Sequence, residues 1–117
     1  MREKAFGRGR EMNERERCRL AEKAAVLKAL GHPTRLFVVE ELGRGERCVC
    51  DLVDKIGADI STVSRHLSVL KHAGIVLDEK RGLQVFYRLR DPALLAFVAH
   101  IETMVEARVR AQAALLR

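Results

Sequence analysis

Two cysteines separated by a single residue, Cys48 and Cys50, are the side chains with the most chemistry to offer. Thiolates bind soft metal and metalloid ions, and a pair of thiols can be oxidised to a disulfide. In a regular helix, residues two apart lie about 200° apart around the axis, so their sulfurs cannot share one ion. At the start of a helix both sulfurs can turn to one side, and the helix dipole there lowers the pKa of a thiol. The alternative is that both are small buried apolar residues, as free cysteines often are.

The third cysteine, Cys18, decides how many thiolates the chain can offer. Soft trivalent ions such as As(III) and Sb(III) prefer three sulfur ligands, and Cys48 with Cys50 supplies two. Cys18 lies between Arg17 and Arg19 in a helix-forming segment, where it is either the third ligand or a bystander on a helix face. Three cysteines are too few for the disulfide framework of a small secreted domain, so we expect free thiols, metal ligands or a redox switch.

Hydrophobic periodicity predicts the elements that would position these cysteines. It indicates helices over residues 12–30, 33–42, 48–56, 61–74 and 92–117, and strands over residues 75–80 and 83–90. Pro33 suits the first turn of the second helix, and Ser61 or Asp59 is a good N-cap for the fourth. Arg81 and Gly82 predict a two-residue hairpin turn between the strands, with Gly82 at positive φ.

A helix, a tight turn and a second helix, followed by a hairpin, predict a winged helix-turn-helix, mainly α with a β-hairpin wing. In such a fold the second helix enters the major groove of DNA, and small polar residues at its start approach base edges. The alternative is that the serines and threonine are caps and the basic residues a solvated face. The predicted DNA-binding residues are Ser61, Thr62, Ser64, Arg65, Ser68, Lys71, His72, Lys80, Arg81 and Gln84.

Length and charge agree with a small nucleic-acid-binding protein. The 117 residues suit a flexible basic tail over residues 1–11 and one domain over residues 12–117, and the formal net charge is +6. Residues 55–90 carry seven basic and three acidic side chains. No base–nucleophile pair or phosphate-binding loop is visible, which argues against an enzyme. With no apolar run near the ~20 residues of a membrane span and no signal-peptide core, we expect a cytoplasmic protein without a membrane partner.

The first and last predicted helices both carry apolar stripes. Leu20, Ala24 and Leu27 mark the first stripe, and the second is longer. A helical core this small cannot cover both of them. We therefore expect a homodimer in which these two helices pair across a two-fold axis. The second stripe comprises Leu94, Val98, Ile101, Val105, Val109 and Leu116.

Four segments resemble the ArsR/SmtB family of winged-helix metal-sensing repressors. They are His32-Pro33-Thr34-Arg35-Leu36, Cys48-Val49-Cys50-Asp51-Leu52, the run from Ser61 to Val76, and a wing containing Arg81-Gly82 and Val85-Phe86-Tyr87-Arg88-Leu89. The run from Ser61 to Val76 is the most specific of these. The resemblance implies a cytoplasmic homodimer that represses an operator and releases it when a metal or metalloid binds.

The resemblance also bears on the ligands. The arsenic-responsive pattern is Cys-Val-Cys-Asp-Leu-Cys, and Val53 stands where its third cysteine would be. Members that sense cadmium or lead join cysteines near the N-terminus to the same pair across the dimer, a part that Cys18 could play. The zinc and cobalt sensors' site on the last helix is not expected. Asp91 matches its first ligand, but Ala93, Met104 and Ala107 occupy the other positions.

The leading hypothesis is therefore a DNA-binding repressor of the arsenic-resistance type, released from its operator by As(III) or Sb(III) on Cys48 and Cys50, with Cys18 as the candidate third ligand. A repressor of the same fold that senses Cd(II) or Pb(II), or thiol oxidation, is the alternative. A third hypothesis is a thiol metal-binding protein without a DNA role, against which the segment from Ser61 to Val76 argues.

Overall fold

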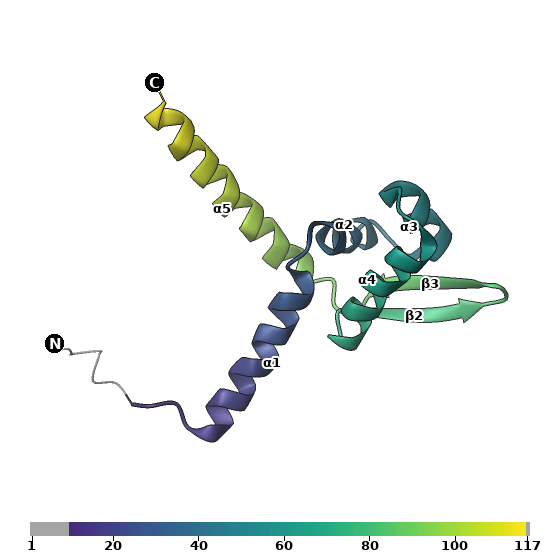
Figure 1. The fold of residues 1–117 in the computed structure, drawn as a ribbon, viewed down its shortest axis with the longest axis horizontal. Coiled ribbons are helices and arrows are strands. Elements are labelled where there is room, and N and C mark those ends of the chain that lie inside the picture. The colour runs from purple at the N-terminus through teal and green to yellow at the C-terminus, as the bar shows by residue number, and fades with distance from the viewer. Residues whose placement is uncertain (1–9, 117) are drawn as a thin grey trace.

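The computed structural model describes residues 10–116 (Figure 1). Most of the predicted tail over residues 1–11 lies outside this range. The chain forms five helices and three strands in the described range. They are α1 (Glu14–Leu30), α2 (Pro33–Leu42), β1 (Arg47–Cys48), α3 (Val49–Ile56), α4 (Ile60–His72), β2 (Val76–Arg81), β3 (Gln84–Leu89) and α5 (Leu94–Leu115).

The core lies between α2, α3, α4 and the sheet. Apolar residues at helical spacing on α4 place Val63, Leu67 and Leu70 fully inside it, as predicted. They pack in one buried cluster with residues of α2 and α3, including Val39 and Leu52. Burying aliphatic side chains of this size is worth about 1.5–3 kcal/mol each, so this cluster fixes where α4 sits.

The helix-turn-helix depends on two backbone features. Gly57 ends α3 in the left-handed conformation, with φ of 76°, which costs a glycine little. Asp59 then caps α4, because its carboxylate accepts hydrogen bonds from the Thr62 N–H at 2.7 Å and the Ser61 hydroxyl at 3.1 Å. Asp59, rather than Ser61, is thus the N-cap. The helix therefore begins at Ile60, as the Asp59 alternative predicts, and ends at His72, two residues before the predicted end.

The three strands form one antiparallel sheet in the order β1-β3-β2. Arg81 pairs with Gln84, so the two turn residues are Gly82 and Leu83. The predicted turn, Arg81-Gly82, is wrong by one residue. Gly82 has φ of 63° and therefore takes the first central position of the turn, which favours glycine. Leu83 stands fully exposed at the tip of the hairpin.

The two long helices leave the core on the side away from the hairpin and diverge (Figure 1). The last helix, α5, begins at Leu94 rather than at Pro92. The apolar stripes of both helices are largely uncovered within this chain, at Leu20 and Leu27 on α1 and at Ile101, Val105 and Val109 on α5. Among residues 10–116 no helix combines the length and apolar character needed to cross a bilayer.

Candidate metal and DNA-binding sites

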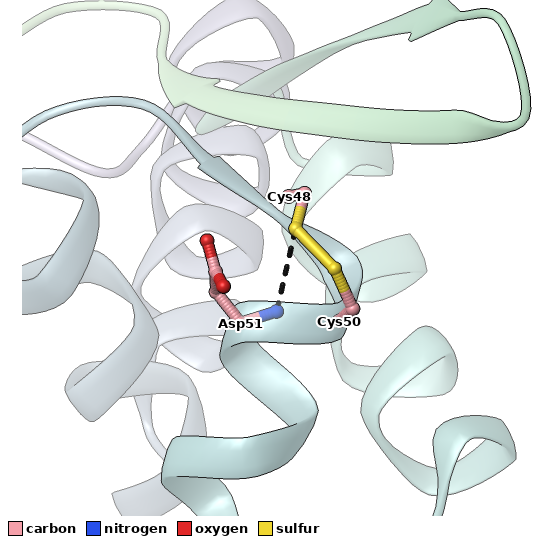
Figure 2. Close-up of side chains that lie close together, drawn as sticks. All are labelled: Cys48, Cys50 and Asp51. Atoms are coloured by element: carbon pink, nitrogen blue, oxygen red, sulfur yellow. Dashed lines mark hydrogen bonds between the residues drawn. A yellow bond between two sulfur atoms is a disulfide. The ribbon is translucent and has the colours of Figure 1, made fainter.

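The cysteine pair lies where strand β1 turns into helix α3. Cys48 is the last residue of β1 and the N-cap of α3, with extended backbone (φ −81°, ψ 160°). Its sulfur accepts a hydrogen bond from the Asp51 N–H at 3.4 Å (Figure 2). Cys48 is 6% exposed, whereas Cys50 in the first turn of α3 is exposed. One sulfur is therefore fixed in the protein while the other is open to solvent.

The helix start brings the two sulfurs together, as its non-helical backbone predicts. In the structure Cys48 and Cys50 form a disulfide, with Cα atoms 5.4 Å apart (Figure 2). That separation lies within the ordinary range for bridged cysteines. In the reduced state the same backbone offers two thiolates to one ion.

A third group beside the sulfurs is the carboxylate of Asp51. One ligand atom each from Cys48, Cys50 and Asp51 lies within 4.8 Å of the others. Within residues 10–116 this is the one such group of three or more histidine, cysteine or acidic residues. Sequence reasoning included Asp51 in the segment that resembles the family but not among the candidate ligands. Its position next to a Cys-x-Cys pair at a helix start was the signal that could have identified it.

Cys18 is not part of this group. It is exposed in the second turn of α1, where its sulfur lies 4.0 Å from a carboxylate oxygen of Glu14. Figure 1 shows the first turns of α1 well away from α3. Cys18 and the Cys48–Cys50 pair of one chain are therefore not brought together by this fold.

A buried carboxylate fastens the segment that carries the pair. Glu41 of α2 is 7% exposed, and its Oε1 lies 3.5 Å from Lys55 Nζ and 3.9 Å from Arg47 Nε. The same oxygen accepts no hydrogen bond from another described residue. Because Arg47 belongs to β1 and Lys55 to α3, this charge holds both sides of the cysteine segment against α2.

The predicted DNA-binding residues of α4 lie mainly on its exposed face. Thr62 is half-buried, and the other six are exposed. Lys71 pairs with Asp78 at 3.0 Å, and the His72 ring contacts the Ser68 carbonyl at 2.8 Å. The Arg65 side chain forms no hydrogen bond or ion pair with the described residues. The six exposed residues are Ser61, Ser64, Arg65, Ser68, Lys71 and His72.

The three predicted residues of the wing differ in how free they are. Lys80 and Gln84 are exposed near the hairpin tip. Arg81 is instead held by Glu46, through hydrogen bonds of 2.7 and 2.8 Å, and by Glu79, through one of 2.8 Å. In this conformation its guanidinium is therefore engaged by carboxylates.

His66, which lies inside the helix-turn-helix, has a packing role. Its Nδ1 lies 3.2 Å from Nη1 of Arg35, and its ring centroid lies 4.4 Å from that of His32. Burial, reinforced by the charges of His32 and Arg35, lowers the pKa of His66 below its ordinary value. A neutral His66 therefore joins α4 to the start of α2.

Comparison with known proteins identifies the family to which this fold belongs. Residues 32–77 match the family described as bacterial regulatory proteins of the arsR family. The crystal structure of the transcriptional repressor BigR from Xylella fastidiosa is 36% identical, with a TM-score of 0.66, over 80% of this chain and 96% of BigR. The chain belongs to the ArsR family.

Other ArsR-family relatives carry different names. The repressor SmtB of Mycobacterium tuberculosis is 43% identical over 76 residues, which cover 65% of this chain and 53% of SmtB. The chain thus spans about half the length of that relative. The arsenical resistance operon repressor of Escherichia coli is 42% identical over 77 residues, covering 65% of each protein.

A solved structure extends the likeness to most of the chain. The homodimeric winged helix-turn-helix DNA-binding domain of Mb0332 from Mycobacterium bovis has a TM-score of 0.73 at 27% identity, over 83% of this chain and 90% of that domain. The predicted winged helix-turn-helix fold is confirmed. So is the prediction that this ArsR-family protein is not an enzyme, since its relatives are transcriptional regulators.

Proposed function

We propose that a homodimer of this ArsR-family chain binds operator DNA as a repressor and is released when As(III) or Sb(III) binds the thiolates of Cys48 and Cys50. The observation that carries the proposal is the convergence of both sulfurs at the first turn of α3. Helix α3 packs directly against α4. An ion bound there therefore acts one helix away from the surface that we assign to DNA.

The DNA-binding surface is the exposed face of α4 together with the wing. Arg65 is a cation without a carboxylate partner in the described structure, and it lies beside Ser64 and Ser68 on the exposed face of the helix. Hydroxyls and a guanidinium at this position suit base edges and phosphates in a major groove. Lys80 and Gln84 lie near the exposed tip of the hairpin, from which they would contact the adjacent backbone or minor groove.

The homodimer is supported by the uncovered stripes on α1 and α5. A second copy that pairs these helices across a two-fold axis would remove both stripes from water. Mb0332, the structural relative, is itself homodimeric. Two copies of α4 would then address the two halves of one operator.

The chemistry at the cysteines is a ligand exchange. Arsenite, As(OH)3, forms one S–As bond with each thiol and loses one water per bond, since the thiol proton leaves with an As–OH group. Two such bonds use Cys48 and Cys50 and leave one ligand position on arsenic. Asp51, Cys18 from the second copy or the remaining hydroxide would fill that position. A softer, larger site that includes Cys18 would also take Cd(II) or Pb(II).

The test is a titration of the reduced protein on its own promoter fragment, followed by fluorescence anisotropy. The arms of the experiment are As(III), Sb(III), Cd(II) and hydrogen peroxide. Release at about one As(III) per subunit, reversed by excess dithiol, is the expected result. Coupling free energies of this kind are typically about 1–3 kcal/mol, which corresponds to a 5- to 150-fold loss of affinity. DNA binding that persists through every arm would refute thiol sensing, and no DNA binding would refute the repressor.

A redox-sensing repressor is the second candidate, favoured by the disulfide between Cys48 and Cys50. Hydrogen peroxide would take two electrons from the two thiols, the sulfurs would join, and the two protons would leave in two molecules of water. The exposed Cys50 is the sulfur that solvent oxidants can reach. Release by peroxide alone, reversed by dithiol, would select this candidate over the metalloid sensor.

A further inference from the structure

The wing arginine is clamped by the segment that leads into the cysteine pair. Arg81 donates from Nη1 and Nη2 to the two carboxylate oxygens of Glu46, at 2.7 and 2.8 Å. Its guanidinium also lies 4.6 Å from the centroid of the Phe86 ring. A two-pronged contact between guanidinium and carboxylate is among the stronger and more directional ion pairs. These residues are 35 positions apart in the chain, so the contact exists only in the folded protein.

Glu46 stands next to the thiol site in space and in sequence. It lies two residues before Cys48, and β1 pairs Arg47 with Tyr87 and Cys48 with Phe86 on the central strand of the sheet. The ring of Phe86, which pairs with Cys48, is the one beneath the guanidinium of Arg81. A shift of β1 at Cys48 therefore moves the Glu46 carboxylate that binds Arg81. It also moves β3, whose Phe86 ring lies against the Arg81 guanidinium.

We propose that Glu46 is a positioning residue that couples the thiol site to the wing. With the sulfurs held together, by the disulfide of this structure or by one ion bound to both, Glu46 holds the guanidinium of Arg81. With the sulfurs free, the β1 segment relaxes, the ion pair opens, and Arg81 exchanges the carboxylate for a DNA phosphate. A carboxylate and a phosphate present similar pairs of oxygens to a guanidinium, so only one of them can accept hydrogen bonds from the same two N–H groups at a time.

Solvent exposure makes this exchange feasible. The side chain of Arg81 is 44% exposed and that of Glu46 is 32% exposed. Ion pairs at such positions contribute little to stability, so a phosphate from DNA can compete for the arginine. Glu79 also accepts a hydrogen bond from Arg81, at 2.8 Å, but it lies two residues away on the same strand and moves with the wing. Glu79 is therefore the matched control, since it offers the same charge to the same arginine from β2, which does not pair directly with the cysteine strand β1.

The inference rests on the proposed function, and its test compares Glu46→Gln with Glu79→Gln in the reduced, full-length protein. Each change removes one negative charge close to the wing, so in the absence of As(III), where Arg81 has already left Glu46, both should tighten binding to the promoter fragment only slightly and to a similar extent. The measured quantity is the ratio of the Kd with As(III) to the Kd without it. We expect Glu46→Gln to lower this ratio roughly threefold, the factor typical of one partly exposed ion pair. The Glu79→Gln variant should keep the ratio of the unmodified protein. An unchanged ratio in Glu46→Gln, or an equal fall in both variants, would overturn the inference.

A second measurement separates this inference from the proposed function because it uses neither DNA nor arsenic. The side-chain N–H resonances of Arg81 are recorded by NMR in the reduced protein and after peroxide has joined Cys48 and Cys50. We expect slow exchange with solvent in the disulfide form, fast exchange in the reduced form, and fast exchange in both forms of Glu46→Gln. Equal exchange in the two forms of the unmodified protein would refute the clamp even if As(III) releases the promoter. A clear difference would support it even if As(III) is not the inducer.

Discussion

Replacing Cys48 by serine or alanine separates its role as a helix cap from its role as a thiolate. The Cys48 sulfur caps α3 through a hydrogen bond of 3.4 Å from the Asp51 N–H, and the residue is 6% exposed. Alanine removes the cap and the buried sulfur. The cap is worth ~0.5 kcal/mol for so long a contact, and the sulfur about 0.8 kcal/mol, as for one buried methylene. We expect Cys48→Ala to lower the unfolding free energy by roughly 1–2 kcal/mol.

Serine restores a better acceptor at the same position. Serine is favoured over alanine at an N-cap by ~1 kcal/mol, so Cys48→Ser should regain most of the loss. In a domain of this size that difference corresponds to about 4 °C in Tm. Both variants nevertheless lose one of the two thiolates. Both should therefore bind the promoter fragment normally when reduced and should no longer be released by As(III).

The assay pairs thermal melting of the reduced protein, at one fixed protomer concentration, with anisotropy titrations in the presence and absence of As(III). The Kd ratio should fall from the 5- to 150-fold range to near one in both variants, while their Tm values differ. Cys18→Ser is the control for loss of a thiol elsewhere, and a large loss of As(III) affinity there would identify the third ligand. Release of Cys48→Ser at the As(III) concentrations that release the unmodified protein would refute the assignment. If the loss of As(III) release were large in Cys48→Ala and small in Cys48→Ser, in parallel with their Tm values, the two substitutions would have changed only the folding of the protein.

Three further predictions concern α4. Arg65→Ala should weaken promoter binding while leaving Tm unchanged. The slope of log K against log salt should fall by about 0.9, as expected for one lost phosphate contact. An unaltered slope would show that Arg65 is not part of the DNA interface. Leu70→Ala should lower the unfolding free energy by about 2–5 kcal/mol in urea titrations, because Leu70 is fully buried. Val69 lies beside it on the exposed side of the helix, so Val69→Ala should lower the unfolding free energy far less. Because burial lowers the pKa of His66, the unfolded chain takes up that proton at higher pH than the folded chain. Tm should therefore fall as the pH drops below about 6.5, and His66→Gln should flatten the curve in that window; an equally steep curve in the variant would contradict the assignment.

The fold was largely readable from the sequence because its elements depend on neighbours along the chain. Helical spacing placed Val63, Leu67 and Leu70 on the buried side of α4, and Pro33 marked the start of α2. Helix ends were less accurate, since Ser61 and Asp59 are both good caps and only the fold shows which carboxylate or hydroxyl meets the free N–H groups. The hairpin was identified, but its register was not, because register depends on cross-strand pairing as well as on Gly82.

The sequence by itself determined the helices, the hairpin, the basic side chains of α4 and a Cys-x-Cys pair at a helix start. Only the tertiary structure decided which groups meet there. The two-residue strand β1 is too short to carry a period of its own and exists because β3 pairs with it. The Asp51 carboxylate lies beside the two sulfurs, whereas Cys18 of the same chain lies away from them. Glu46 binds Arg81, which is 35 residues further along the chain. Local periodicity cannot encode such contacts, because they form between segments that only the packed core brings together.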